Sequence, residues 1–376
     1  MELNEDQIMV REMAAAFAKE RVAQEAPKWE KAGRVDADFL REMGALGLLG
    51  MTVPEEYGGA DTGYVAFALA IVEIAAGDGG LSTLMSVQNS LTNGLILHAG
   101  TAEQKKAYLP KTASGTCIGA FCLTEPQVGS DAAALKTRAE KTDSGDYVLS
   151  GTKQFVTSGE IAEVAIIFAV TNEAEGKHGI TAFLVPADTP GYKVARAEEK
   201  LGQKSSDTAQ LVFEDMKVPA ECVLGEVGEG YRLALSNLEA GRIGIAAQSV
   251  GMARAALDFA VQYAKERESF GQPIIQHQAV SFRLADMAAK LKSAELMTLE
   301  AARQKDASIP CLEQACMAKL LASEVAEEVC SAAIQTLGGY GYLSEYPVEK
   351  IYRDVRVCQI YEGTSDIQRM IIARGL

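Results

Sequence analysis

Residues 164–170 read VAIIFAV and residues 180–185 read ITAFLV, and these two runs decide the fold prediction. Short runs of β-branched and aromatic residues bounded by turn residues are typical of strands. Residues 146–149 and 210–213 form two further runs, and Gly, Asp, Asn and Pro separate them all. No helical stretch lies between the runs, whereas a parallel dinucleotide-binding sheet needs a helix between consecutive strands. The sequence therefore predicts an antiparallel β module.

The sequence on both sides of this module has helical periodicity. Near the start, Asn4 is placed to cap a helix with Gln7 three residues later, and an Ala-rich helical stretch runs from 64 to 76 before 78–80 (DGG) ends it. After the β module the helical period returns, for example over 312–337, and long Ala-rich helices indicate an antiparallel bundle. We therefore expect an α+β, mainly α chain with an N-terminal α-helical domain (1–117), a middle β domain (118–225) and a C-terminal helical domain (226–376).

The composition limits the classes of function. The chain has 376 residues, 48% of them hydrophobic, and a formal net charge of −15. An acidic balance argues against nucleic-acid binding, because phosphate backbones are bound by clustered Lys and Arg. It is still compatible with a small anionic ligand, since a few local cations and helix N-termini can hold a phosphate.

Cysteine usage and the N-terminus indicate the compartment. The seven cysteines are scattered without a C-x-x-C pair, and the three histidines lie far apart, so neither a disulfide framework nor a metal site is expected. The first six residues (MELNED) are acidic and no long uninterrupted apolar stretch occurs. We expect a cytoplasmic protein without an export signal or a membrane span.

Five segments could carry chemistry, although each has an ordinary structural explanation when taken alone. A Pro/Gly loop, a strand with an aromatic residue, a charged helix end, a glycine-rich helix end and a loop with one glutamate are common in proteins without any function attached. The segments are 123–131 (LTEPQVGSD), 151–159 (GTKQFVTSG), 265–278 (KERESFGQPIIQHQ), 335–342 (QTLGGYGY) and 359–368 (QIYEGTSDIQ).

The fifth segment contains the candidate base. Glu362 stands between Tyr361 and Gly363, with Ile360 and Ile367 nearby, so its carboxylate could be partly desolvated. Desolvation raises the pKa of a carboxyl group, as a general base near neutral pH requires. A single glutamate is nevertheless usually exposed and inert, so this segment alone decides nothing.

Together the five segments resemble the acyl-CoA dehydrogenases in order and spacing, over residues 2–375. The connecting sequence is most similar to the short-chain (butyryl-CoA) branch, as in 53–59, 200–202 and 352–354. The resemblance implies an N-terminal helical domain, a middle antiparallel β domain and a C-terminal four-helix domain. It also implies FAD as cofactor, an acyl-CoA substrate, a homotetramer built as a dimer of dimers, and an electron-transferring flavoprotein as partner.

The same resemblance assigns roles to individual residues. It implies that Glu362 is the catalytic carboxylate. Cofactor-binding residues on the flavin side are Phe121, Leu123, Thr124, Ser130, Phe155, Thr157, Thr364 and Asp366. Those at the diphosphate and adenine end are Arg267, Ser269, Phe270 and Gln278, and Gln335, Gly338 and Gly339 are offered to the FAD of a neighbouring subunit. Substrate-binding residues are Ser130, Glu239, Arg242, Tyr361 and Gly363.

Three positions refine this assignment. Some branches of the family place their base immediately before an Arg on the helix that leads into the C-terminal bundle, but here Gly241 precedes Arg242, which favours Glu362. Phe155 stands where many members carry Trp, so the ring beside the flavin is smaller. Residues 81–88 lack the Arg of the glutaryl-CoA branch, which argues against a dicarboxylic substrate.

The expected reaction is the α,β-dehydrogenation of a short-chain acyl-CoA to the trans-2-enoyl-CoA, a step of fatty acid β-oxidation. Glu362 would take the α-proton, the β-hydride would pass to flavin N5, and an electron-transferring flavoprotein would accept the electrons. Hydrogen bonds from the Glu362 backbone N–H and the flavin ribityl hydroxyl would polarise the thioester carbonyl. The alternatives are a branched-chain, aromatic-type or alicyclic acyl-CoA dehydrogenase, a non-catalytic flavin- or CoA-binding scaffold, and a helical interaction protein without cofactor.

Overall fold

The computed structural model describes residues 2–376, and its first helix, α1 (Glu5–Phe17), begins as the sequence predicts. The side chain of Asn4 accepts a hydrogen bond from the backbone N–H of Gln7 at 2.8 Å, and the Gln7 side chain accepts one from the N–H of Asn4 at 3.1 Å. This capping box satisfies two N–H groups that the first helical turn leaves free. The N-terminal elements that follow are η1 (Ala18–Val22), α2 (Ala23–Ala32), α3 (Ala37–Ala45), η2 (Glu55–Tyr57), α4 (Gly63–Gly77), α5 (Gly79–Ser86), η3 (Val87–Asn93), α6 (Gly94–Ala99) and α7 (Ala102–Ala113).

Helix α4 is the buried centre of the N-terminal helices. Every residue from Val65 to Ala75 is buried, because α4 packs against α1 on one side and against the C-terminal helices α8 and α9 on others. The predicted end at 78–80 is confirmed, and the same residues also start the next helix. Asp78 ends α4, and its side chain accepts a hydrogen bond from the N–H of Leu81 at 2.7 Å, which caps α5.

The middle of the chain forms one sheet without helical crossovers. Its strands are β1 (Gly119–Cys122), β2 (Arg138–Lys141), β3 (Tyr147–Thr157), β4 (Val164–Val170), β5 (Ile180–Pro186), β6 (Tyr192–Ala197), β7 (Thr208–Val218) and β8 (Val223–Leu224), joined with η4 (Ala132–Ala134), η5 (Glu173–Gly179) and η6 (Ala220–Cys222). The order is β6-β7-β3-β2-β4-β5-β8, and β1 pairs with β4. Most neighbours are antiparallel. The pairs β1–β4 and β2–β4 are parallel, because the chain makes the β2–β3 hairpin before it returns to β4.

The burial of β4 explains why residues 164–170 are apolar throughout. Val164, Ile166 and Phe168 belong to a core shared with helices α6 and α7, whereas Ala165 and Ile167 belong to a core between the strands of the sheet. Successive side chains of a strand point to opposite faces, so a strand covered on both faces shows no polar alternation.

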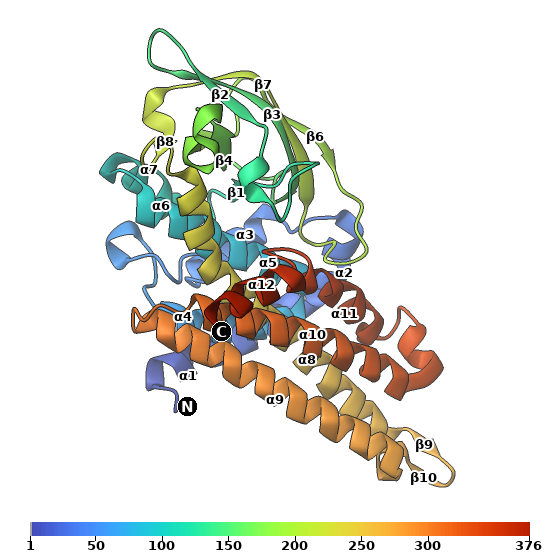
Figure 1. The fold of residues 1–376 in the computed structure, drawn as a ribbon. Coiled ribbons are helices and arrows are strands. Elements are labelled where there is room, and N and C mark those ends of the chain that lie inside the picture. The colour runs from blue at the N-terminus through green and yellow to red at the C-terminus, as the bar shows by residue number, and fades with distance from the viewer. Residues whose placement is uncertain (1) are drawn as a thin grey trace.

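The C-terminal part is a helical bundle built around the 37-residue helix α8 (Gly230–Glu266). In Figure 1 this helix runs from the sheet down to the far end of the bundle, where the short β9–β10 hairpin turns the chain back. Helix α8 packs against α10, α4 and α9, so it contacts all the main helices. The remaining elements are β9 (Glu268–Ser269), β10 (Gln272–Pro273), η7 (Ile274–Gln276), α9 (Gln278–Asp306), α10 (Leu312–Leu337), η8 (Gly338–Tyr342), α11 (Pro347–Val355), η9 (Arg356–Gln359) and α12 (Ser365–Gly375).

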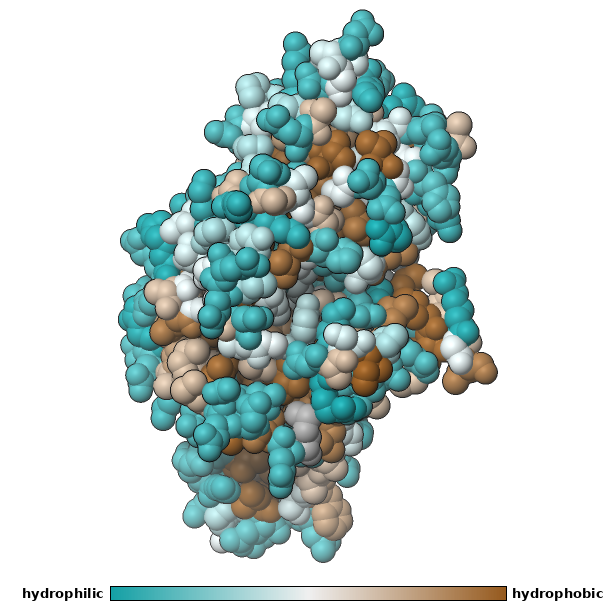
Figure 2. Space-filling view, turned by 90° about the vertical axis from the view of Figure 1, so that its left-hand side faces the viewer, coloured by the Kyte–Doolittle hydropathy of each residue, from teal (hydrophilic) through white to brown (hydrophobic). Residues whose placement is uncertain are grey.

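The surface is mainly polar. On the side drawn in Figure 2, hydrophilic residues cover most of the surface and hydrophobic residues form separate patches. Within residues 2–376, no helix combines the length and the apolar character that crossing a membrane requires.

A buried polar cluster joins the three parts of the chain. Lys350 of α11 donates to Asp78 at 2.9 Å and to Asp354 at 2.5 Å. The Ser205 hydroxyl also donates to Asp78, and the backbone N–H of Gln203 donates to Asp354. Burial alone would lower the pKa of Lys350, but the two carboxylates more than reverse this effect and raise it. Lys350 therefore stays charged and holds α5, the 201–207 loop and α11 together.

We predict that Lys350→Met destabilises the fold, because it leaves two buried carboxylates without their cation. Breaking a buried ion pair from one side typically costs about 3–5 kcal/mol. Thermal unfolding followed by circular dichroism measures the effect, and Lys28→Met, at an exposed lysine on α2, is the control. Equal melting temperatures for the two variants would contradict the role given to Lys350.

Candidate active site

Glu362 lies in the turn between η9 and α12, and its backbone has an unusual conformation. Glu362 has φ 52° and Gly363 has φ 90°, so two consecutive residues are left-handed. A positive φ is unfavourable for a residue with a Cβ and persists where the surroundings hold it. The turn must therefore be held by specific contacts.

Two buried side chains hold this turn by its carbonyl groups. Gln368 of α12 donates through Nε2 to the carbonyl of Gly363 at 2.8 Å and to that of Glu362 at 3.3 Å. Lys319 of α10 donates through Nζ to the carbonyl of Gly363 at 2.8 Å. Gln368 and Lys319 are both fully buried, so water does not compete for these hydrogen bonds.

Gly241 of α8 provides the space for the Glu362 carboxylate. A Cβ added at Gly241 would lie 2.0 Å from Glu362 Oε2 and 3.2 Å from Leu91 Cδ2. No side chain other than hydrogen fits at this position unless the carboxylate moves. In the sequence, Gly241 indicated only that the alternative base is absent. The structure adds a steric reason for a glycine at this position.

The Glu362 carboxylate is buried without a hydrogen-bond partner among residues 2–376. Both of its oxygens are inaccessible to water, although the residue as a whole is half-buried. Burial raises the pKa of Glu362 to about 7, while the charges of Lys319 and Arg242 act in the opposite direction. A carboxylate with this pKa can accept a proton near neutral pH and keeps its lone pairs free for a substrate.

Arg242 lies close to this carboxylate, and Glu239 points elsewhere. Arg242 is 4% exposed, and its Nε and Nη1 have no hydrogen-bond partner within the described chain. Glu239 pairs with Lys305 at 2.8 Å and accepts a hydrogen bond from the Cys311 thiol at 3.4 Å. Both residues were assigned to the substrate by the resemblance. Arg242 has unused donors near Glu362, whereas the Glu239 carboxylate already accepts hydrogen bonds from Lys305 and Cys311.

The side chain of Tyr361 enters a second polar cluster. Its hydroxyl donates to Gln248 of α8 at 2.6 Å and accepts from Gln203 at 3.2 Å. Thr83 of α5 lies 3.3 Å from the same hydroxyl. Burial is the main reason why the pKa of Tyr361 is raised well above its usual value, so the phenol stays neutral. This cluster forms a polar boundary next to the Glu362 turn.

The flavin-side residues gather on one edge of the sheet. Phe155 sits at a β-bulge of β3 with φ 56°, and its ring is 64% exposed. Val156 is buried while Thr157 is half-buried, so Phe155 and Thr157 share the accessible side. A bulge aims a side chain away from the regular pleat, and nothing in the sequence indicated it. The loop with Thr124 joins this edge, since its carbonyl accepts the N–H of Gln154 at 2.8 Å.

Beside this edge, the remaining flavin-side residues occupy different environments. Phe121 of β1 packs its ring 4.9 Å from that of Phe168, and Leu123 is half-buried. Ser130 and Asp366 are exposed. Thr364 caps α12 by accepting the N–H of Ile367 at 3.3 Å.

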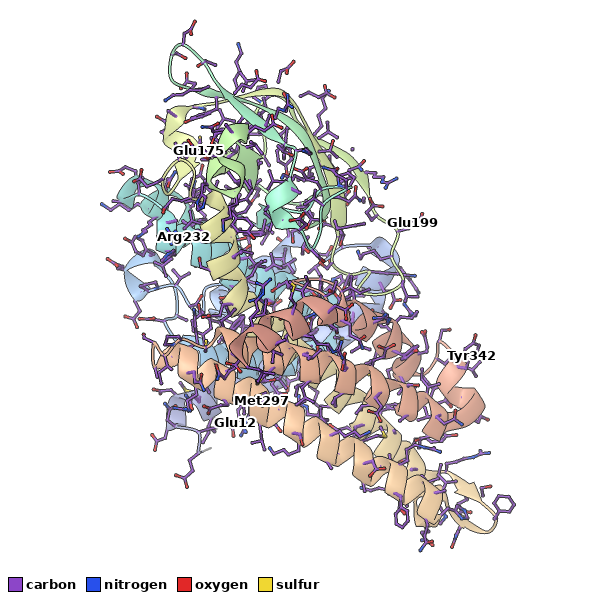
Figure 3. All side chains as sticks on the ribbon, in the orientation of Figure 1. Glu12, Glu175, Glu199, Arg232, Met297 and Tyr342 are labelled. Carbon is purple, nitrogen blue, oxygen red and sulfur yellow. The ribbon has the colours of Figure 1, made fainter. Side chains whose placement is uncertain are left out.

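The residues assigned to the diphosphate and adenine end lie at the far end of the bundle, away from α12 (Figure 1). The guanidinium of Arg267 lies 5.7 Å from the ring centroid of Tyr340, which brings the β9–β10 hairpin and the 335–342 loop together. Phe270 at the hairpin tip is 96% exposed, and Tyr342 projects from the neighbouring loop (Figure 3). Exposed residues in this group also include Gln278, Gln335, Gly338 and Gly339, and Ser269 is half-buried.

Sequence reasoning missed Lys319, Gln368 and Gln248. Gln248 acts through contacts with Tyr361 and Thr83, which are distant in sequence, so no local pattern marks it. Gln368 is the last residue of the fifth segment, but nothing in that segment indicated that its side chain binds the turn. Lys319 carries one faint signal, because it is a lone charge within the apolar run 315–322 (ACMAKLLA).

Comparison with known proteins identifies the family. The chain matches "Acyl-CoA dehydrogenase, N-terminal domain" over 4–116, the middle domain over 120–216 and the C-terminal domain over 228–376. The chain belongs to the acyl-CoA dehydrogenase family. It is thus an oxidoreductase that acts on acyl-CoA, and the resemblance predicted from the sequence is confirmed.

Several relatives belong to the short-chain branch. The mitochondrial short-chain specific acyl-CoA dehydrogenase of Bos taurus is 46% identical over all of this chain and 91% of its own length. The structure of butyryl-CoA dehydrogenase from Megasphaera elsdenii has a TM-score of 0.98 and 40% identity, over 100% of this chain and 99% of that one. A chain solved in work on the electron transferring flavoprotein of Acidaminococcus fermentans also has a TM-score of 0.98, with 42% identity over 100% and 98%.

Acyl-CoA dehydrogenases use FAD, and FAD is the cofactor of this chain. A glutaryl-CoA dehydrogenase from Mycobacterium smegmatis, 34% identical with a TM-score of 0.94 over 99% of this chain and 95% of that one, was solved with FADH2. The present chain fits such a group. The exposed ring of Phe155 can lie against a flat aromatic ligand, and a Cβ at Gly339 would meet no atom of the chain within 4 Å, so its bare backbone stays open to a ligand.

We predict that Gly241→Ala reduces turnover on the order of a hundredfold, because displacing a reacting group by about 1 Å has an effect of that size. The added methyl would overlap Glu362 Oε2, whereas the flavin-side residues would be untouched. Steady-state kinetics and the visible flavin spectrum measure the two effects separately. Gly129→Ala, where a Cβ would meet nothing within 4 Å, is the control. Full activity in Gly241→Ala would show that the carboxylate does not work from this position.

Proposed function

We propose that this acyl-CoA dehydrogenase removes the α-proton of a short-chain acyl-CoA with Glu362 and releases the trans-2-enoyl-CoA. The observation that carries the proposal is the buried, unpartnered carboxylate of Glu362, whose pKa is raised to about 7. A carboxylate that serves only structure would have its hydrogen-bonding capacity used. This feature also weighs against a non-catalytic scaffold.

The chain itself must orient and deprotonate the substrate. Removing an α-proton requires a base at hydrogen-bond distance and donors that stabilise the enolate oxygen. The held turn of Glu362 and Gly363 keeps the carboxylate in one place, and its backbone N–H is the chain's proposed donor to the thioester carbonyl. Such a donor is typically worth roughly 3 kcal/mol. Bound FAD supplies the hydride acceptor.

The surroundings of Glu362 favour a short acyl chain. Along one face of α8, Gly241 contacts Glu362 and Gly244 contacts Ser86 and Phe67, with a Cβ at Gly244 placed 2.1 Å from Ser86 Oγ. One turn further, Gln248 is engaged with the Tyr361 hydroxyl. An alkyl chain that extended past Glu362 would have to break this cluster and leave buried polar groups unpaired. Branched-chain, aromatic-type and alicyclic substrates remain alternatives to a straight short chain.

The separation of the two cofactor-binding groups supports an oligomer. The strands that carry flavin-side residues and the β9–β10 hairpin beside the adenine-end residues lie at opposite ends of the molecule (Figure 1). A neighbouring subunit that offered its bundle tip to the sheet edge of this one would complete the site. We therefore propose the homotetramer, a dimer of dimers, that the resemblance implies, with an electron-transferring flavoprotein as the electron acceptor.

We predict that Glu362→Gln loses turnover by a factor on the order of 10² to 10⁴, because the amide cannot accept the proton. FAD binding should persist, since the shape of the side chain is kept. Anaerobic addition of butyryl-CoA, followed by the bleaching of the oxidised flavin band, measures the step directly. Near-normal bleaching in this variant would rule out Glu362 as the base.

We predict that kcat/KM of the unmodified enzyme rises with pH through about 7, because the base must be ionised and the pKa of Glu362 is raised to about 7. At lower pH it should fall roughly tenfold per pH unit, as expected for one essential carboxylate. A kcat/KM profile that is flat between roughly pH 5 and pH 8 would contradict the assignment.

We predict that Gln248→Ala shifts preference toward longer substrates. The truncation removes a polar side chain from the end of the proposed acyl site, and two more buried CH₂ groups are worth about 1.6 kcal/mol together. The ratio of kcat/KM for hexanoyl-CoA to that for butyryl-CoA should rise roughly tenfold. Gln262→Ala, at an exposed glutamine on the same helix, is the matched control. An unchanged ratio would place the acyl chain elsewhere.

A further inference from the structure

Lys319 is a fully buried lysine whose Nζ is directed at the active-site turn. It lies on α10 and is 0% exposed. Its Nζ donates to the carbonyl of Gly363 at 2.8 Å, so its hydrogen-bond partner is a neutral group rather than a carboxylate. Transferring an ammonium group out of water is very unfavourable unless it is paired, and one carbonyl offsets little of this penalty. Another group must therefore compensate the charge.

The Glu362 carboxylate lies near Lys319 and partly offsets this penalty. Burial lowers the pKa of Lys319 to about 8, whereas the neighbouring Cys358 and Glu362 act to raise it. In turn, Lys319 is the first charged neighbour that lowers the pKa of Glu362. Lys319 binds the carbonyl of Gly363, and Gly363 directly follows Glu362 in the chain.

We propose that Lys319 is a positioning residue for the reaction: its Nζ holds the left-handed Glu362–Gly363 turn, and its positive charge keeps the base ionised. This inference rests on the proposed role of Glu362 as the base. The proposal explains why the buried group carries a charge, because the neutral Gln368 side chain already donates a hydrogen bond to the same Gly363 carbonyl at 2.8 Å. What Lys319 adds to the turn is the charge.

Lys319 is the main titratable cation beside Glu362, as the other groups around it show. Arg242 on α8 is the second cation, and an arginine stays charged at all pH values used for enzymes. Cys316 on α10 and Cys358 on η9 also face Lys319, and burial raises the pKa of both thiols, so they are neutral at pH 7. The Tyr361 phenol is neutral for the same reason.

Variants at position 319 separate the charge from the hydrogen bond. Lys319→Gln can still donate to the Gly363 carbonyl but has no charge, Lys319→Arg keeps the charge, and Lys319→Met has neither. Loss of the cation raises the pKa of Glu362, so the ionised base appears only at higher pH. We expect the acidic limb of the kcat/KM profile to move upward by roughly one pH unit in Lys319→Gln and to stay in place in Lys319→Arg. Lys319→Met should show the same shift and also lose roughly tenfold in rate at high pH, because the turn is held by one donor fewer.

The experiment measures kcat/KM for butyryl-CoA against pH for the unmodified holoenzyme, the three variants and Lys28→Gln as the control lysine. A limb for Lys319→Gln that coincides with that of the unmodified enzyme would overturn the proposal, as would an equal shift in Lys319→Arg. Lys319→Gln carries the test if Lys319→Met does not fold. Failure of the proposed function is distinguishable, because Glu362→Gln would then keep near-normal bleaching of the flavin by butyryl-CoA, whatever the Lys319 variants show.

Discussion

Other segments of the chain must come very close to the backbone of helix α8, and the rest of the structure depends on this constraint. Three glycines on this helix meet groups from three different elements. A Cβ would lie 2.0 Å from Glu362 at Gly241, 2.1 Å from Ser86 at Gly244 and 2.2 Å from the Val72 carbonyl at Gly251. Segments packed at this distance bury every residue of the helix from Ala240 to Ala253. The active-site carboxylate reaches its buried position only because α8 presents a bare backbone to it.

Burial then decides the chemistry of every charged group near the site. A carboxylate, a lysine and an arginine lie close together without direct ion pairing, and the pKa values of Glu362 and Lys319 depend on each other and on the charge of Arg242. Desolvation pushes Glu362 toward its neutral form, and the two cations oppose this effect. The result is a carboxyl group with a pKa of about 7, which neither burial nor the cations would produce alone.

The polar clusters that surround the site connect it to the fold. Gln203 contributes its backbone N–H to Asp354 and its side chain to Tyr361, so one residue belongs to both clusters. The first cluster joins the N-terminal helices, the sheet domain and α11, and the second lies directly against the Glu362 turn. The relative placement of the three domains and the geometry of the base are therefore parts of one hydrogen-bonded network.

The sequence by itself determined the order of helices and strands and the family, and it singled out Glu362 as the residue proposed as the base. Periodicity and caps are local, so Asn4, the buried strand 164–170 and the helix 312–337 could be located from neighbouring residues alone. Only the tertiary structure decided the left-handed turn at Glu362, the bulge at Phe155, and the placement of Lys319, Gln248 and Gln368 around the base. Lys319 and Gln248 depend on contacts between segments distant in the chain, Gln368 binds a turn only a few residues away, and the space around the carboxylate excludes water. Neither long-range contact nor desolvation is encoded in any short stretch of sequence.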